Sequence, residues 1–198
     1  DIAAMISVGV TQPGVTPTPC SIHQTTISSL KPGETMNFAP RATAFNLIDN
    51  CTIRQGGRFN PEGTGVALTH VSDSKVLHCE IHDFFYTGVS VGWTWGFRGS
   101  VAQRNEIAFN RIYDLGKGIM SDMGGVYTLG DNAGSEVANN WIWEVNGYAG
   151  NGAPAWGLYT DEGSQGLVFR DNLVARCRDG AIHQHYGREN VYSNNLFL

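Results

Sequence analysis

Apolar residues recur along most of this chain in one repeating arrangement. A marker position, occupied by cysteine or asparagine, has an apolar residue three places before it and another two places after it. The markers are Cys51, Cys79, Asn110, Asn140, Asn172 and Asn195. The apolar residues are Ile48, Val76, Ile107, Val137, Phe169 and Tyr192 before the markers, and Ile53, Ile81, Ile112, Ile142, Val174 and Phe197 after them. Successive markers are 28, 31, 30, 32 and 23 residues apart, a period typical of solenoids.

Each repeat contains short β-branched runs separated by Gly, Asn and Asp, without a stretch of helical periodicity. Such a unit cannot bury its own apolar edge, so neighbouring units stack at the strand spacing of about 4.8 Å. Because crossovers between parallel strands are right-handed in nearly all cases, we predict an all-β, single-stranded right-handed parallel β-helix of about six coils over residues 46–198. We expect the marker column at a bend between two sheets, where asparagine tolerates left-handed backbone angles and its amides can bond along the axis.

Residues 1–45 do not follow the repeat. The segment 11–20 is rich in proline and threonine, and Lys31-Pro32-Gly33-Glu34 is a turn signal. We interpret residues 1–45 as an irregular N-terminal cap or edge segment, because a solenoid must cover its terminal core. The chain begins at Asp1 and stops in mid-coil, so we expect a mature protein or a truncated one whose later coils are missing.

A second alignment indicates which side chains share the outer face of one predicted sheet. Two positions in each coil should point inward: Val66, Val89, Val126, Leu158 and Ile182, then Leu68, Val91, Thr128, Thr160 and Gln184. Two others should point outward: Ala67, Ser90, Tyr127, Tyr159 and His183, then Thr69, Gly92, Leu129, Asp161 and His185. Along the axis this face changes from small, inert side chains to tyrosine, histidine and aspartate. We interpret it as a binding face; the alternative is an outer face packed under a loop.

Composition narrows the function. The 25 glycines in 198 residues suit a turn-dense single domain, and the net charge of −5 without a basic cluster disfavours a nucleic-acid partner. No apolar run approaches the roughly 18 residues of a membrane span, so we expect no membrane partner. The four cysteines have no zinc-site spacing. Parallel stacking disfavours a disulfide between Cys51 and Cys79, which we expect to be buried thiols.

Large aromatic residues flank the predicted binding face. Trp93, Trp95 and Phe97 follow one strand, Trp156 precedes another, and Tyr148 lies in the loop before it. Aromatic faces stack on the C–H faces of sugar rings, whose hydroxyls bond to acids and amides. Each aromatic residue alone is explained by packing, but their concentration at one strand end predicts a carbohydrate groove.

Carboxylates stand on two adjacent coils of this face. Asp122 comes just before one strand, and Asp161 lies 39 residues later within the next coil's strand, about one rung away. Carboxyl groups this close titrate at different pH values and can supply an acid and a base, the minimum machinery for cleaving a glycosidic bond. Glu162 follows Asp161 directly in the chain. For this residue a structural role, in a turn or paired with an arginine, is as good an explanation as a role at the site.

Three segments resemble right-handed β-helix glycoside hydrolases of family 141: residues 122–130 (DMGGVYTLG), 156–164 (WGLYTDEGS) and 183–190 (HQHYGREN). Residues 95–100 (WGFRGS) resemble that family's aromatic loop, and the resemblance covers about residues 45 to 198. It implies secreted bacterial enzymes, extracellular or periplasmic, that act on plant polysaccharides with fucosidase and xylanase activities. Its two catalytic aspartates correspond to Asp122 and Asp161. Residues expected to bind substrate are Trp93, Trp95, Arg98, Tyr127, Trp156, Tyr159, Glu162, His183, His185 and Tyr186.

Two other functions remain open from the sequence. His183 and His185 alternate on one strand face beside Asp161, and these three could hold a divalent metal that activates water against an ester or lactone. Aspartates on adjacent rungs could instead hold Ca²⁺, as in polysaccharide lyases with this fold. A non-catalytic carbohydrate-binding β-helix is the second alternative.

Overall fold

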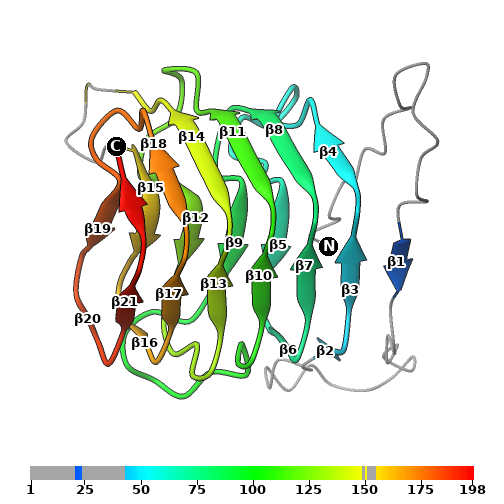
Figure 1. Cartoon of the computed structure of the whole chain (residues 1–198), viewed down its shortest axis with the longest axis vertical. Helices are drawn as coiled ribbons and strands as arrows, with labels where there is room; N and C mark the ends of the chain where they lie inside the picture. The colour runs from blue at the N-terminus through cyan, green and yellow to red at the C-terminus, as the bar shows by residue number, and fades with distance from the viewer. Residues whose placement is uncertain (1–20, 24–42, 149, 151–154) are drawn as a thin grey trace, which may run out of the picture.

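The computed structural model describes residues 21–23, 43–148, 150 and 155–198, and within these ranges every regular element is a β-strand (Figure 1). In the seven-stranded sheet the strands are β1 (Ser21–His23), β3 (Leu47–Asp49), β7 (Lys75–Leu77), β10 (Glu106–Ala108), β13 (Glu136–Ala138), β17 (Val168–Arg170) and β21 (Val191–Ser193). In the six-stranded sheet they are β4 (Thr52–Arg54), β8 (Glu80–Phe84), β11 (Arg111–Leu115), β14 (Trp141–Val145), β18 (Leu173–Ala175) and β22 (Leu196–Phe197).

A five-stranded sheet contains β5 (Val66–Leu68), β9 (Val89–Val91), β12 (Met123–Thr128), β15 (Ala155–Thr160) and β19 (Ile182–Gln184). Two short pairs complete the described strands: β2 (Thr43–Ala44) with β6 (Val71–Ser72), and β16 (Ser164–Gln165) with β20 (Gly187–Arg188). All pairings are parallel except that of β1 with β3. Successive coils therefore lie side by side in stacked sheets (Figure 1), an arrangement consistent with the predicted parallel β-helix. The right-handed sense of the coil stays a prediction.

The predicted columns have the predicted register. Ile112 pairs with Ile81 on one side and Ile142 on the other, and all three side chains are fully buried. Ile107 pairs in the same way with Val76 and Val137 in the neighbouring sheet. The apolar residues of successive coils thus meet along the axis in one core, because identical positions superimpose when coils stack, although Phe197 of the last described coil is 40% exposed.

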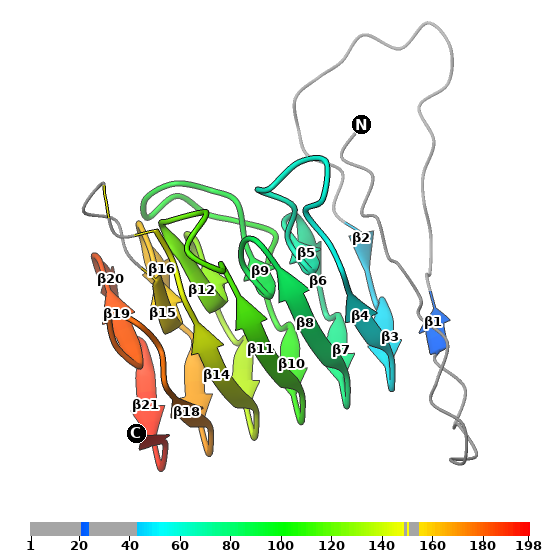
Figure 2. The ribbon, with the colours of Figure 1, turned by 90° about the horizontal axis from the view of Figure 1, so that it is seen from above.

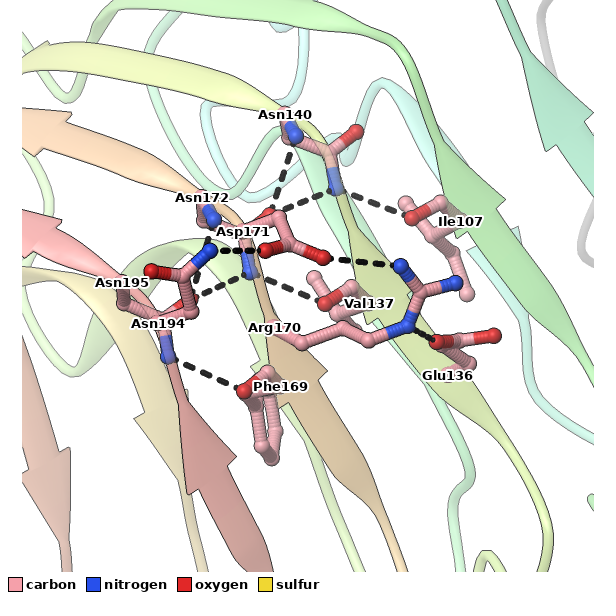
Figure 3. A network of polar contacts seen from close by, with 10 residues as sticks. All are labelled: Ile107, Glu136, Val137, Asn140, Phe169, Arg170, Asp171, Asn172, Asn194 and Asn195. Carbon is pink, nitrogen blue, oxygen red and sulfur yellow. Dashed lines mark hydrogen bonds and ion pairs between the residues drawn. The ribbon is translucent and has the colours of Figure 1, made fainter.

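The marker asparagines form a hydrogen-bonded ladder. Asn140 Oδ1 accepts from both the backbone N–H and the side-chain amide of Asn110, each at 3.0 Å, while Asn140 Nδ2 donates to the carbonyl of Ile107 at 2.9 Å. Asn172 and Asn195 repeat the pattern on the following coils (Figure 3). These side chains satisfy buried backbone groups at the bend, where the strand ladders cannot.

One detail of the bend differs from the prediction. The left-handed backbone angle falls on the residue before each marker, for example Phe109 with φ 60° and Asn139 with φ 55°, rather than on the marker asparagine. The ladder asparagines therefore serve as hydrogen-bonding groups, and residues of several types turn the chain.

The structure corrects part of the prediction for the cysteines. Cys79 is a buried free thiol, as predicted. Cys51 is disulfide-bonded, so its predicted free thiol is wrong; its partner is neither Cys79 nor Cys177, which are both free. The predicted cap over residues 1–45 lies mostly outside the described residues. No helix able to span a membrane occurs in the described part of the chain.

Candidate active site

The five-stranded sheet aligns the predicted outward column. Tyr127 on β12 pairs with Ser90 on β9 and with Tyr159 on β15, and Tyr159 pairs with His183 on β19. This register agrees with the sequence alignment. The solvent exposure differs from that expected for an open outer face, because Tyr127 and Tyr159 are only 5% and 4% exposed. The outer face is therefore largely covered here, which is the packed alternative considered for this face.

Trp156 and His183 pack against Tyr159, and part of the face is covered by the segment 92–99, hereafter the aromatic loop, which extends along the axis across the following coils (Figure 2, green). A side chain at Gly130 would overlap the carbonyl oxygen of Thr94, and one at Gly163 would overlap the backbone of Gly96. Both glycines also have positive φ, 76° and 75°. The glycines after β12 and β15 are thus required by the turn and by the loop backbone that crosses above them.

Further along, the aromatic loop is held by the last coil. Phe97 packs edge-on against Tyr186, with ring centroids 5.7 Å apart, and the guanidinium of Arg188 lies 4.4 Å from the Phe97 ring centroid. Arg98 of the loop is exposed. Arg188 was missed from the sequence because nothing in the chain pattern indicates that the loop reaches so far.

Two indoles of the aromatic loop remain accessible beside the tyrosines. Trp93 and Trp95 are 39% and 52% exposed, and their rings meet edge-to-face at 5.2 Å. Trp93 also lies 6.5 Å from the ring of Tyr127. The predicted sugar-stacking residues are therefore at the edge of the covered face, with ring surface available to a ligand.

Asp161, just after β15, is buried and accepts hydrogen bonds at both oxygens. The Tyr127 hydroxyl donates to Oδ2 at 2.5 Å, and Nδ1 of His185 lies 2.8 Å from Oδ1. The Asp161 side chain is only 8% exposed, whereas that of His185 is 49% exposed. A buried carboxylate is tolerated here because hydrogen bonds and a histidine compensate for lost hydration.

Asp122, just before β12, is exposed and has a left-handed backbone with φ 56°. Its Oδ1 accepts a hydrogen bond from the Tyr159 hydroxyl at 2.9 Å, and its backbone carbonyl accepts one from Tyr86 at 2.8 Å. Tyr86 was missed from the sequence, since it stands outside the repeated strand pattern. It fixes the strained turn that directs Asp122 toward β15.

Two crossed contacts therefore join the carboxylates through the tyrosine pair. Tyr127 of β12 binds the aspartate after β15, and Tyr159 of β15 binds the aspartate before β12. Their rings meet edge-to-face at 5.1 Å and 89°. We call Asp122, Tyr127, Tyr159, Asp161 and His185 the carboxylate site. The structure places both predicted catalytic aspartates in it.

The phenols of this site are held as proton-bearing donors. Burial raises the pKa of Tyr127, and its hydrogen bond to Asp161 raises it further. Burial likewise raises the pKa of Tyr159, together with its hydrogen bond to Asp122 and the charge of Asp161. Burial and the nearby charge of Asp122 raise the pKa of Tyr86 to about 12. The carboxylates accept from Tyr127 and Tyr159, whereas Tyr86 donates to the backbone carbonyl of Asp122.

The remaining predicted residues surround the carboxylate site. His183 stacks on Trp156 with ring centroids 4.1 Å apart and an interplanar angle of 11°. The Tyr186 hydroxyl donates to Glu162 Oε2 at 3.0 Å, so Glu162 pairs with tyrosine rather than with arginine. Asp161, His183 and His185 do not form a group that could hold a metal ion, and no such group of three occurs among the described residues.

Comparison with known proteins gives one informative likeness. No family model and no curated protein matches the chain. A solved structure named "Glycoside hydrolase" resembles it with a TM-score of 0.67 and 30% sequence identity. The match covers 77% of this chain and 25% of the other, so the chain spans about a quarter of that protein's length. The chain thus has a glycoside hydrolase-like fold.

Proposed function

We propose that this protein hydrolyses glycosidic bonds of a plant or bacterial polysaccharide, on a right-handed parallel β-helix of the family 141 type. The observation that carries the proposal is the pair Asp122 and Asp161, one exposed and one buried, joined through hydrogen-bonded tyrosines. Two carboxyl groups in different environments suit acid–base chemistry at an anomeric carbon. The likeness to a glycoside hydrolase agrees with this reaction class.

In this proposal the substrate lies against the accessible indoles of the aromatic loop. Trp93 and Trp95 offer ring faces to sugar C–H groups, and Arg98, Glu162 and Tyr186 are polar residues at the same edge. Sugar recognition by stacked aromatics and a few polar groups is a common arrangement. Trp156 and His183, stacked together, would bound the opposite side of the carboxylate site.

The proposed location is extracellular or periplasmic, with residues 1–45 as a cap and 46–198 as the catalytic β-helix. The disulfide at Cys51 supports an oxidising compartment, because disulfides are rare in cytosolic proteins. No nucleic-acid or membrane partner is part of the proposal.

The test is an activity screen on the purified chain. Xylans, fucosylated plant polysaccharides and aryl glycosides of both sugars are incubated with the protein, and new reducing ends or released phenol are measured. Asp122→Asn should abolish the activity found, whereas Asp49→Asn, a carboxyl group paired with His78 in another sheet, should keep it. Binding to polysaccharide without turnover would favour the non-catalytic carbohydrate-binding alternative.

Chelation separates the carboxylate mechanism from the metal-dependent alternative. The proposed reaction uses side chains alone, so EDTA should leave the rate unchanged. If EDTA abolishes turnover and Ca²⁺ or another divalent ion restores it, the metal-dependent hydrolase of an ester or lactone, or the lyase, becomes the better model.

A further inference from the structure

The carboxylate site contains two acceptors, yet cleavage of a glycosidic bond requires a proton donor for the leaving oxygen. Asp161 accepts at Oδ2 from Tyr127 and at Oδ1 from His185. Asp122 accepts at Oδ1 from Tyr159. The two phenols keep their protons, since their pKa values are raised. The hydrogen that can be transferred must therefore be sought among the other members of the site.

We infer that His185 is the general acid and that Asp161 positions it; the inference rests on the proposed glycosidic hydrolysis. The ring is oriented by the 2.8 Å contact between Nδ1 and Asp161 Oδ1, and half of its side chain is exposed. Nε2 has no hydrogen-bond partner among the described residues, which leaves this nitrogen for a ligand. A buried carboxylate behind one ring nitrogen fixes the orientation of the imidazole, so that its other nitrogen points to the ligand side.

The neighbouring histidine does not fit this role. Burial lowers the pKa of His183, and the charge of His185 lowers it further. His183 is also stacked flat on Trp156. The groups that face His185 are Asp161, the ring of His183 at 6.4 Å, and the ring of Tyr186 at 5.2 Å, whose hydroxyl is bonded to Glu162. His185, in direct contact with Asp161 and half exposed, is therefore the histidine placed to act on a ligand.

The proposed step balances as follows. The Nε2–H bond of protonated His185 breaks, and its proton bonds to the glycosidic oxygen. The bond between that oxygen and the anomeric carbon breaks, and its electron pair remains on the oxygen. A water oxygen bonds to the carbon while Asp122 takes the water's proton, which returns to His185 through solvent after product release. Asp161 stays ionised throughout and compensates the imidazolium charge.

Leaving-group dependence tests this assignment. Methyl glycosides of xylose and fucose need a proton on the departing oxygen, whereas the corresponding 2,4-dinitrophenyl glycosides do not. His185→Ala should lower kcat by at least ~10²-fold on the methyl glycosides but by less than about tenfold on the dinitrophenyl glycosides. Asp122→Asn removes the base and should lower kcat on both series. His78→Ala removes an equivalent histidine contact with Asp49 elsewhere and should change neither series.

Each other outcome has a definite meaning. If Asp122→Asn is slowed much more on the methyl glycosides than on the dinitrophenyl glycosides, while His185→Ala cleaves both at near-parental rates, the inference is overturned and Asp122 is the acid. If only Asp161→Asn is slowed much more on the methyl glycosides than on the dinitrophenyl glycosides, Asp161 itself is the acid. If Asp122→Asn, Asp161→Asn and His185→Ala all match the parent, or the parent cleaves neither series, the proposed function at this site fails and the acid role fails with it.

A second measurement needs no substrate. NMR titration of the imidazole signals should show the His183 pKa rising toward its ordinary value in His185→Ala, because one neighbouring positive charge is removed. An unchanged His183 pKa in His185→Ala would show that His185 carries no proton beside it, and would overturn the inference whatever the kinetics of the other variants.

Discussion

The backbone of Gly96 lies directly over Gly163, so closely that a side chain at position 163 would overlap it. This contact holds the aromatic loop against the end of β15, next to Asp161. It links a loop that follows β9 to a turn two coils away. The position of Trp95, which precedes Gly96 in the chain, depends on it.

Gly163→Ala should therefore displace the aromatic loop. Gly163 has φ 75°, which costs alanine about 1–2 kcal/mol, and overlap with Gly96 should add roughly 1–3 kcal/mol of strain or move the loop. Gly118→Ala is the matched control, since Gly118 has φ 73° and nothing within 4 Å of an added Cβ. Urea unfolding and binding of an active oligosaccharide should both be weakened more by Gly163→Ala. Equal effects of the two variants would mean that the loop is not held at this point.

The buried isoleucine column gives a second prediction. Ile142→Asp should unfold the protein, because an unpaired carboxylate in the core costs several kcal/mol against a typical stability of about 5–15 kcal/mol. Ile119→Asp is the control at a position that is 49% exposed, and it should melt close to the parent. Thermal unfolding followed by circular dichroism decides between them. A parental melting temperature for Ile142→Asp would show that this column is not the core.

The two aspartates should affect turnover together. Asp122→Asn and Asp161→Asn should each lower kcat by at least ~10²-fold, because the first removes a group used in proton transfer and the second removes the group that positions one. The double variant should be scarcely slower than the poorer single one, because both act in one step. Kinetics on a glycoside cleaved by the parent provide the measurement, with Asp49→Asn as the control. If the double variant loses kcat by the product of the two single losses, the two aspartates do not act in one shared step.

Their effects on stability should differ. Asp161→Asn should lose about 1–3 kcal/mol, because Tyr127 and His185 lose a buried charged acceptor. Asp122→Asn should unfold like the parent, since Asp122 is exposed. Denaturant unfolding of both variants tests this contrast, and equal destabilisation would contradict the difference in burial.

Cys79 gives a pH-dependent prediction. Burial raises the pKa of this thiol from 9.0 to about 11. The unfolded chain therefore ionises first, so the stability due to the protonated thiol is complete below pH 9 and is lost as the pH rises from 9 to 11. The stability difference between the parent and Cys79→Ala should shrink over that range, whereas the difference for Val76→Ala, which has no titrating group, should stay constant. A constant difference for Cys79→Ala would contradict the shift.

Much of the structure follows directly from the repeat in the sequence. In a stacked coil each position lies above its counterpart, so one-dimensional spacing translates directly into contacts along the axis. Ile112 meets Ile142, Asn110 meets Asn140, and Tyr127 meets Tyr159, as the alignment predicts. The aspartates could be assigned to neighbouring coils for the same reason.

Contacts that do not follow the repeat were decided by tertiary structure alone. The aromatic loop leaves the strand register and runs along the axis, so the sequence could not show that its Trp93 lies beside Tyr127 or that its Phe97 meets Arg188. The crossed bonds of the two aspartates likewise depend on side-chain torsions and on the left-handed turn at Asp122. Alternation along a strand determines which face a side chain occupies, whereas only the folded path of the loops determines what covers that face and which groups its polar atoms bind.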